Sequence, residues 1–108
     1  MVRHISPCAL AQALAAGQAV RLIDVRQPWE SRLASLADSL LIPLSELAQR
    51  SKEIGADHDA ALVVYCHHGI RSQSAAAYLE RLGYQNVQSL TGGIDAWSCE
   101  VDSAVPRY

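Results

Sequence analysis

The fold of this chain is decided by the stretch ALVVYCHHGIRS, residues 61–72 of 108. Its first five residues form a continuous apolar run, which is typical of a central strand covered on both faces of a parallel sheet. A helix is expected to follow over about 72–82, with Ala75, Leu79 and Leu82 on one face. A buried strand, a short loop and a helix form the unit from which parallel α/β sheets are built.

The rest of the chain repeats this alternation of strands and helices. Further strands are expected at 20–25, 39–42 and 86–90, and helices at 6–17, 28–33, 45–52 and 94–97. The alternation predicts a largely parallel sheet with helices on both faces, and residues 1–108 are expected to form a single domain. Ligands of such sheets bind at the carboxyl ends of the strands. Residues 66–71 leave the expected central strand at that edge.

Composition and charge narrow the classes of function. Half of the residues are hydrophobic, 19% are charged and the formal net charge is −2, so the signature of a disordered chain is absent. Nine basic residues stand against eleven acidic ones, without the basic excess that is typical of nucleic-acid binding, and we expect no nucleic-acid partner. Because no run approaches the ~18 apolar residues of a membrane span, we expect no membrane association.

The cysteine pattern bears on the redox state of the compartment and on metal binding. Cys8, Cys66 and Cys99 form an odd, widely spaced set without the spacing of a zinc site. We expect all three cysteines to be reduced thiols in a reducing, cytoplasmic compartment. Residues 7–16 follow Arg3 and weakly resemble a signal peptide, but helix signals explain that stretch better. No metal or organic cofactor is implied.

The loop after the expected central strand has the features of a nucleophile site. Cys66 lies between a strand end and a helix start, where successive backbone amides can form a concave nest for an anion. Gly69 permits a positive φ, and Arg71 adds a charge and a planar fork of donors. Together with the positive end of the helix, these features favour the thiolate of Cys66. The same cradle suits an anionic substrate.

Residues 66–72 resemble the active-site loop of the rhodanese family, C-x-x-G-x-R-S, and match it at every fixed position. Residues 24–30 resemble its D-V-R-x-x-x-E segment, 42–44 its I-P-L, and 83–97 its closing G-Y-x-x-V…L-x-G-G-x-x-A-W. The segment 36–40 departs from the family's H-I-x-G-A, because it contains neither His nor Gly. The resemblance implies a rhodanese-like three-layer α/β fold with a largely parallel five-stranded sheet flanked by helices on both faces.

The resemblance also implies an activity and a set of roles. Cys66 is expected to attack the outer sulfur of thiosulfate, or of another persulfide donor, and to hold a persulfide until a thiol or cyanide accepts the sulfur. Asp24 and Arg26 are expected to support the sheet edge beside the loop. The residues expected to bind the anion are His67, His68, Gly69, Ile70, Arg71 and Ser72.

Several alternatives stay open at this point. A sulfur carrier loaded by a protein partner, or a phosphatase or arsenate reductase, would use the same Cys66. Related phosphatases carry Cys-x5-Arg, whereas the spacing from Cys66 to Arg71 is one residue shorter and suits a sulfane sulfur better than a phosphoryl group. Arg71 also has a structural interpretation, a pairing with an acidic residue, which is compatible with substrate binding. The alternative for His67 and His68 is that both simply face solvent.

Overall fold

A computed structural model describes residues 2–55 and 57–108 of the chain. Within these residues five strands form one sheet in the order β1-β5-β4-β2-β3, and every neighbouring pair is parallel. The strands are β1 (Arg3–Ile5), β2 (Val20–Asp24), β3 (Leu40–Leu41), β4 (Ala61–Tyr65) and β5 (Val87–Leu90). The predicted α/β architecture with a parallel, five-stranded sheet is confirmed.

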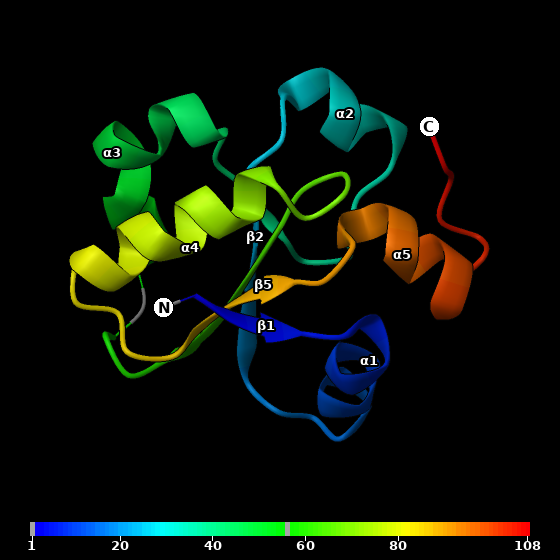
Figure 1. Ribbon diagram of the computed structural model, residues 1–108, viewed down its shortest axis with the longest axis horizontal. Helices are drawn as coiled ribbons and strands as arrows, with labels where there is room; N and C mark the ends of the chain where they lie inside the picture. Colours follow the sequence, from blue (N-terminus) through cyan, green and yellow to red (C-terminus); the bar gives the residue numbers. More distant parts are fainter. Residues whose placement is uncertain (1, 56) are drawn as a thin grey trace.

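Helices cover both faces of the sheet. They are α1 (Pro7–Ala15), α2 (Pro28–Leu33), α3 (Leu47–Arg50), α4 (Arg71–Arg81) and α5 (Gly93–Glu100), with short 3-10 turns η1 (Leu44–Glu46) and η2 (Ser51–Ile54) around α3. Figure 1 shows α3 and α4 on one side of the strands and α1 and α5 on the other. Each side has its own buried apolar cluster, so the molecule has three layers.

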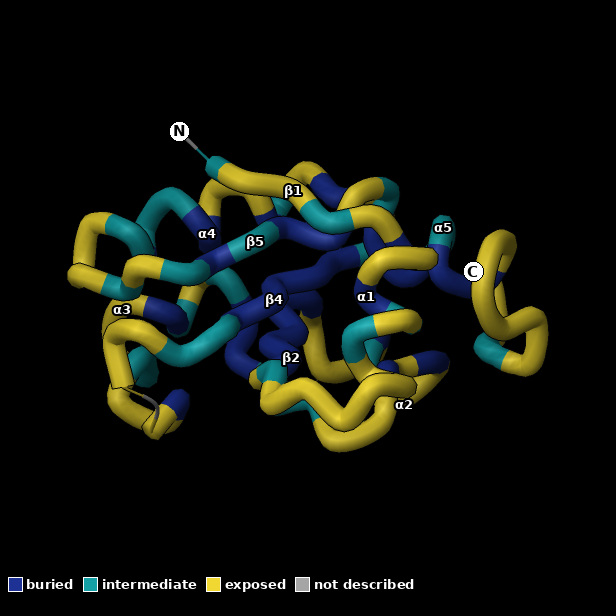
Figure 2. The backbone as a smooth tube through the Cα atoms, turned by 90° about the horizontal axis from the view of Figure 1, so that it is seen from below, coloured by how far each residue is buried: buried dark blue, intermediate teal, exposed yellow. Residues whose placement is uncertain are grey.

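β4 is the buried centre of the sheet, as its apolar run predicts. Residues 62–65 are all buried, and Figure 2 shows β4 and the adjoining part of β2 in the interior. In the register between these two strands Asp24 pairs with Tyr65. The segments that follow β2 and β4 therefore leave the sheet side by side, which brings Arg26 to the same edge as Cys66.

Apart from shifts of one or two residues at element ends, the predicted elements differ from the structure in four places. The strand β1 was not predicted, because three mostly exposed residues carry no hydrophobic pattern. The strand expected at 39–42 is only Leu40–Leu41, since Pro43 lacks the N–H needed to continue a ladder. The helix expected at 45–52 is the η1-α3-η2 series, and the single turn expected at 94–97 is the eight-residue α5.

The segment 36–40, which departs from the family pattern, forms a turn without glycine. Asp38 adopts a positive φ of 62°, a conformation that Asp tolerates better than most residues. The Ser39 hydroxyl donates to the Leu36 carbonyl at 2.8 Å and lies 2.8 Å from the phenol oxygen of Tyr65. Local side-chain hydrogen bonds thus hold this connection in place.

None of the helices in the described part of the chain is both long enough and apolar enough to cross a membrane.

The face of α4 supplies a test of the core. Leu79 is fully buried, whereas Leu82, which was predicted on the same face, lies at the end of the helix and is 39% exposed. We expect Leu79→Ala to lower the free energy of unfolding by about 2–5 kcal/mol, because it leaves a cavity in the core. The matched Leu82→Ala should cost less than about 1 kcal/mol. Denaturant unfolding measures both, and equal losses would contradict the described packing of α4.

Candidate active site

The Cys66 sulfur lies at the focus of the loop between β4 and α4. Cys66 is 1% exposed, and its Sγ accepts hydrogen bonds from the amides of Gly69 at 3.1 Å and Ser72 at 3.4 Å. Gly69 has a φ of +97°, so the positive φ predicted for it is confirmed. Two backbone donors aimed at one buried sulfur stabilise negative charge on that atom.

A pair of buried hydroxyls lies behind the sulfur. The Ser72 Oγ is 3.6 Å from the Cys66 Sγ and 2.7 Å from the Ser89 Oγ on β5, and both serines are fully buried. When the sulfur is a thiolate, Ser89 can donate to Ser72 and Ser72 to the sulfur. The role of Ser89 was not predicted from the sequence, although a polar residue in an otherwise apolar strand is a usable signal.

The start of α5 holds the loop in shape. The amide of Ile94 donates to the Cys66 carbonyl at 2.9 Å, and the amide of Asp95 donates to the His67 carbonyl at 3.1 Å. These bonds draw the loop carbonyls toward α5 and leave the amides of the loop free to face the sulfur. Gly93 makes the contact possible, because a β-carbon there would collide with the carbonyl oxygens of Cys66 and His67.

Arg71 forms a two-pronged ion pair with Glu30 of α2. Its Nη1 and Nη2 donate to Oε1 and Oε2 at 2.7 and 2.8 Å. Hydrogen bonding to Arg71 lowers the pKa of Glu30 to about 2, although burial opposes this shift. Hydrogen bonding to Glu30 in turn raises the pKa of Arg71, although burial opposes this shift, and the nearby Cys66 sulfur adds to the rise. Arg71 is therefore paired with an acid, as its structural interpretation predicts.

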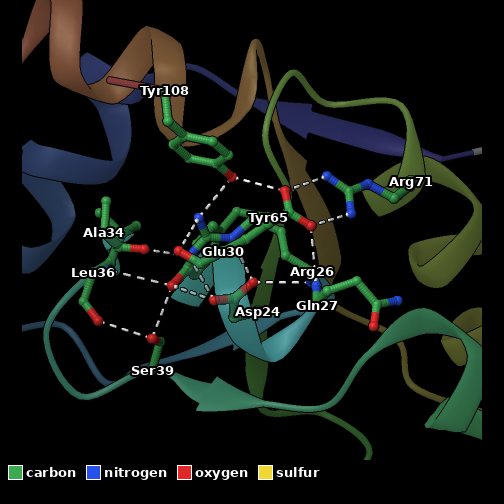
Figure 3. A network of polar contacts seen from close by, with 10 residues as sticks. All are labelled: Asp24, Arg26, Gln27, Glu30, Ala34, Leu36, Ser39, Tyr65, Arg71 and Tyr108. Carbon is green, nitrogen blue, oxygen red and sulfur yellow. Dashed lines mark hydrogen bonds and ion pairs between the residues drawn. The ribbon is translucent and has the colours of Figure 1, made fainter. Parts of the chain in front are cut away.

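Asp24 and Arg26 form a buried ion pair beside the loop (Figure 3). The Arg26 Nε and Nη2 donate to the two carboxylate oxygens of Asp24 at 2.8 and 2.7 Å, and Nη2 also donates to the Ala34 carbonyl. Burial would lower the pKa of Arg26, but hydrogen bonds to Asp24 and Tyr108 raise it above its ordinary value. The pair thus lies where the sequence predicts a support for the sheet edge.

The two histidines of the loop have different surroundings. The His67 ring is half-buried and stacks on His68 on one side and on Tyr108 on the other, each with centroids 3.9 Å apart. Burial, helped by the nearby His68, lowers the pKa of His67. His68 and Ile70 are mostly exposed. The prediction that both histidines face solvent is therefore wrong for His67.

Known proteins resemble this chain over most of its length. The Rhodanese-like domain model matches residues 6–100. The chain belongs to the rhodanese-like domain family. It is similar to a protein named sulfurtransferase from Allochromatium vinosum, with 41% identity over 98 residues that cover 91% of this chain and 90% of that one.

Two further rhodanese-like proteins extend this comparison. A protein named thiosulfate sulfurtransferase GlpE from Pseudomonas syringae is 44% identical over 87 residues, which cover 81% of this chain and 79% of its own. A crystal structure of a rhodanese-related protein from Thermoplasma volcanium superposes with a TM-score of 0.80 at 35% identity, covering 92% of this chain and 93% of that one. The rhodanese-like match ends at residue 100, so Tyr108 lies outside it.

Cys66 lines neither of two cavities, of about 310 and 280 Å³, in the described residues. One cavity, of about 310 Å³, is lined by Val20 and Ala61 at the starts of β2 and β4, the opposite edge of the sheet from Cys66. Within residues 2–55 and 57–108 no three His, Cys, Asp or Glu side chains are grouped as metal ligands.

The contact between α5 and the loop can be tested with two glycines of positive φ. Gly93→Ala should displace the loop carbonyls, unfold at a lower temperature and slow alkylation of Cys66 at neutral pH, because the sulfur loses its amide donors. Gly17→Ala is the control, since nothing lies within 4 Å of the added carbon. We expect it to cost about 1 kcal/mol of backbone strain and to leave alkylation unchanged. An unaltered alkylation rate in Gly93→Ala would contradict the proposed contact.

The Glu30–Arg71 pair predicts a pH dependence of stability. The pKa of Glu30 is lowered from 4.5 to about 2 on folding, so the carboxylate stabilises the fold above pH 4.5 and loses this effect as the pH falls toward 2. We expect Glu30→Gln to be less stable than wild type by up to about 3 kcal/mol at pH 7, with the difference shrinking between about pH 5 and pH 2.

Urea unfolding at a series of pH values measures this difference. Glu46→Gln is a suitable control, because Glu46 pairs with Arg50 at 2.9 Å on the surface and its side chain is 46% exposed. That variant should lose less than about 1 kcal/mol. A constant gap between Glu30→Gln and wild type from pH 7 to pH 2 would refute the assignment.

Proposed function

We propose that this protein is a sulfurtransferase that carries a sulfane sulfur on Cys66. The observation that carries the proposal is the pair of amides, from Gly69 and Ser72, that converge on the Cys66 sulfur at 3.1 and 3.4 Å. A persulfide and an anionic sulfur donor both need such donors. Membership of the rhodanese-like family, and relatives named sulfurtransferase and thiosulfate sulfurtransferase, support the same chemistry.

The reaction proceeds in two displacements. The Cys66 thiolate attacks the outer sulfur of thiosulfate, a new S–S bond forms, and the old S–S bond breaks with its electron pair leaving on sulfite. An acceptor thiolate or cyanide then attacks the outer sulfur of the persulfide, and the electron pair of that S–S bond returns to Cys66. Charge and atoms balance in each step, so the chain needs no oxidant or cofactor for the transfer.

The hydrogen-bond donors around Cys66 have separate roles. The amides of Gly69 and Ser72 hold the charge on the sulfur, and we assign the anionic end of the donor to the remaining loop amides and to Arg71. Two of the five N–H groups of Arg71 bond to Glu30, so three remain for the substrate. Burial lowers the pKa of His67, and we assign no role as a base to this residue.

Mass spectrometry of the intact protein tests the proposal. After incubation with thiosulfate we expect one added sulfur atom on wild type and on Cys8→Ser/Cys99→Ser, and none on Cys66→Ser. Cys8 and Cys99 are exposed free thiols, so the double variant excludes sulfur added at those positions. Cyanide should remove the added sulfur and release thiocyanate in equal amount.

Other outcomes would point elsewhere. Loading of wild type by a protein persulfide but not by thiosulfate would favour a sulfur carrier served by a protein partner. If no donor loads Cys66, the sulfurtransferase proposal fails. Hydrolysis of a phosphate ester or reduction of arsenate that depends on Cys66 would then place the chain among the phosphatases or arsenate reductases.

A further inference from the structure

The segment after α5 returns to the active-site loop. The Ser98 hydroxyl donates to the Val105 carbonyl at 2.5 Å, and Arg107 pairs with Asp95 at 2.9 Å. Val105 and Tyr108 pack against the apolar cluster of the α1 and α5 side. These contacts tie the segment to α5 along its length and deliver the Tyr108 side chain to the edge of the sheet where Cys66 lies.

The Tyr108 phenol joins the two ion pairs of the site (Figure 3). Its oxygen donates to the Glu30 Oε2 at 2.8 Å and accepts from the Arg26 Nη1 at 2.9 Å. The same Glu30 carboxylate holds both Nη atoms of Arg71. Tyr108 therefore shares the negative charge of Glu30 with Arg71 and with the amide of Gln27, which donates to Oε1 at 3.0 Å.

The Tyr108 ring has a separate contact with the loop. It lies parallel to the His67 ring, with an interplanar angle of 6° and centroids 3.9 Å apart, and it meets the exposed Trp29 edge-on at 6.2 Å. His67 is the residue directly after the nucleophile, and its backbone carbonyl is bonded to α5. Tyr108 thus acts on the site by two independent routes. The first runs from its hydroxyl through Glu30, and the second from its ring through His67.

We propose that Tyr108 is a positioning residue of the Cys66 site, whose phenol sets the orientation of Arg71 through Glu30 and whose ring fixes the loop through His67. The first route tunes how strongly the site attracts an anion, because the Tyr108 hydroxyl takes up part of the Glu30 charge that would otherwise act on Arg71. The second route limits motion of the loop. Neither route follows from the matched family region, which ends before Tyr108.

The first test measures anion attraction without relying on sulfur transfer. In a Cys8→Ser/Cys99→Ser background, Cys66 is alkylated by iodoacetate, an anion, or by iodoacetamide, a neutral reagent of similar shape. For Tyr108→Phe we expect the iodoacetate rate to fall about threefold to tenfold, as when part of a charge-assisted hydrogen bond is lost, and the iodoacetamide rate to stay unchanged. A general loosening of the structure would alter both rates.

The matched control is Tyr84→Phe. Tyr84 also lies edge-on against a histidine ring, that of His58 at 4.8 Å, but it is on the side of the sheet that carries α3 and α4. Both alkylation rates should equal those of wild type. Tyr108→Leu removes the stacked ring as well, and it should slow iodoacetate more than Tyr108→Phe does. Equal rates in the two Tyr108 variants would overturn the role of the ring.

The second test rests on the proposed function. For Tyr108→Phe we expect the KM for thiosulfate to rise about threefold to tenfold while kcat stays within about twofold. If Tyr108→Phe shows the same iodoacetate rate and the same KM as wild type, the role of the phenol is overturned. If wild type itself fails to transfer sulfur, the proposed function fails, and the alkylation rates alone decide the role of Tyr108.

Discussion

The inward turn of the loop between β4 and α4 is the constraint on which the site depends. The amides of Gly69 and Ser72 can face the sulfur only if the carbonyls of the loop find partners on the other side, because buried carbonyls must be bonded. The first turn of α5 supplies those partners, and the absence of a side chain at Gly93 lets it approach closely enough. The surroundings of the Cys66 sulfur are thus shaped by an element that starts 27 residues after it.

The charged side chains at this edge of the sheet form pairs of opposite sign, so they add no net charge. Asp24 neutralises Arg26, and Glu30 neutralises Arg71. Taking the charges of Asp24, Arg26 and Glu30 out of water is costly, and close pairing with additional hydrogen bonds offsets that cost. An approaching anion therefore meets oriented N–H groups more than a net positive charge. Such groups are fixed before the substrate arrives, so little reorganisation accompanies binding.

The sequence predicted the parts of the site that are local in the chain. The apolar run 61–65 indicates a buried central strand on its own, and the loop 66–72 carries its donors within seven residues. Ser89 and Tyr108 reach the site through tertiary packing, which no local pattern encodes. Glu30 is intermediate: its place after Asp24 and Arg26 was visible, but its partner Arg71 lies 41 residues away. The exposed strand β1 carries no hydrophobic pattern, because backbone pairing with β5 holds it in the sheet.

The strand order has a consequence for how the site comes into existence. β5 is the last strand in the sequence, yet it lies between β1 and β4. While the chain emerges from the ribosome, the edge of β4 stays open until residues 87–90 are available, and α5 cannot hold the loop before it has itself been synthesised. Until then Cys66 lies on an incomplete sheet, and its loop lacks the bonds to α5. The surroundings of the sulfur are therefore completed only after residues 87–100 have been added to the chain.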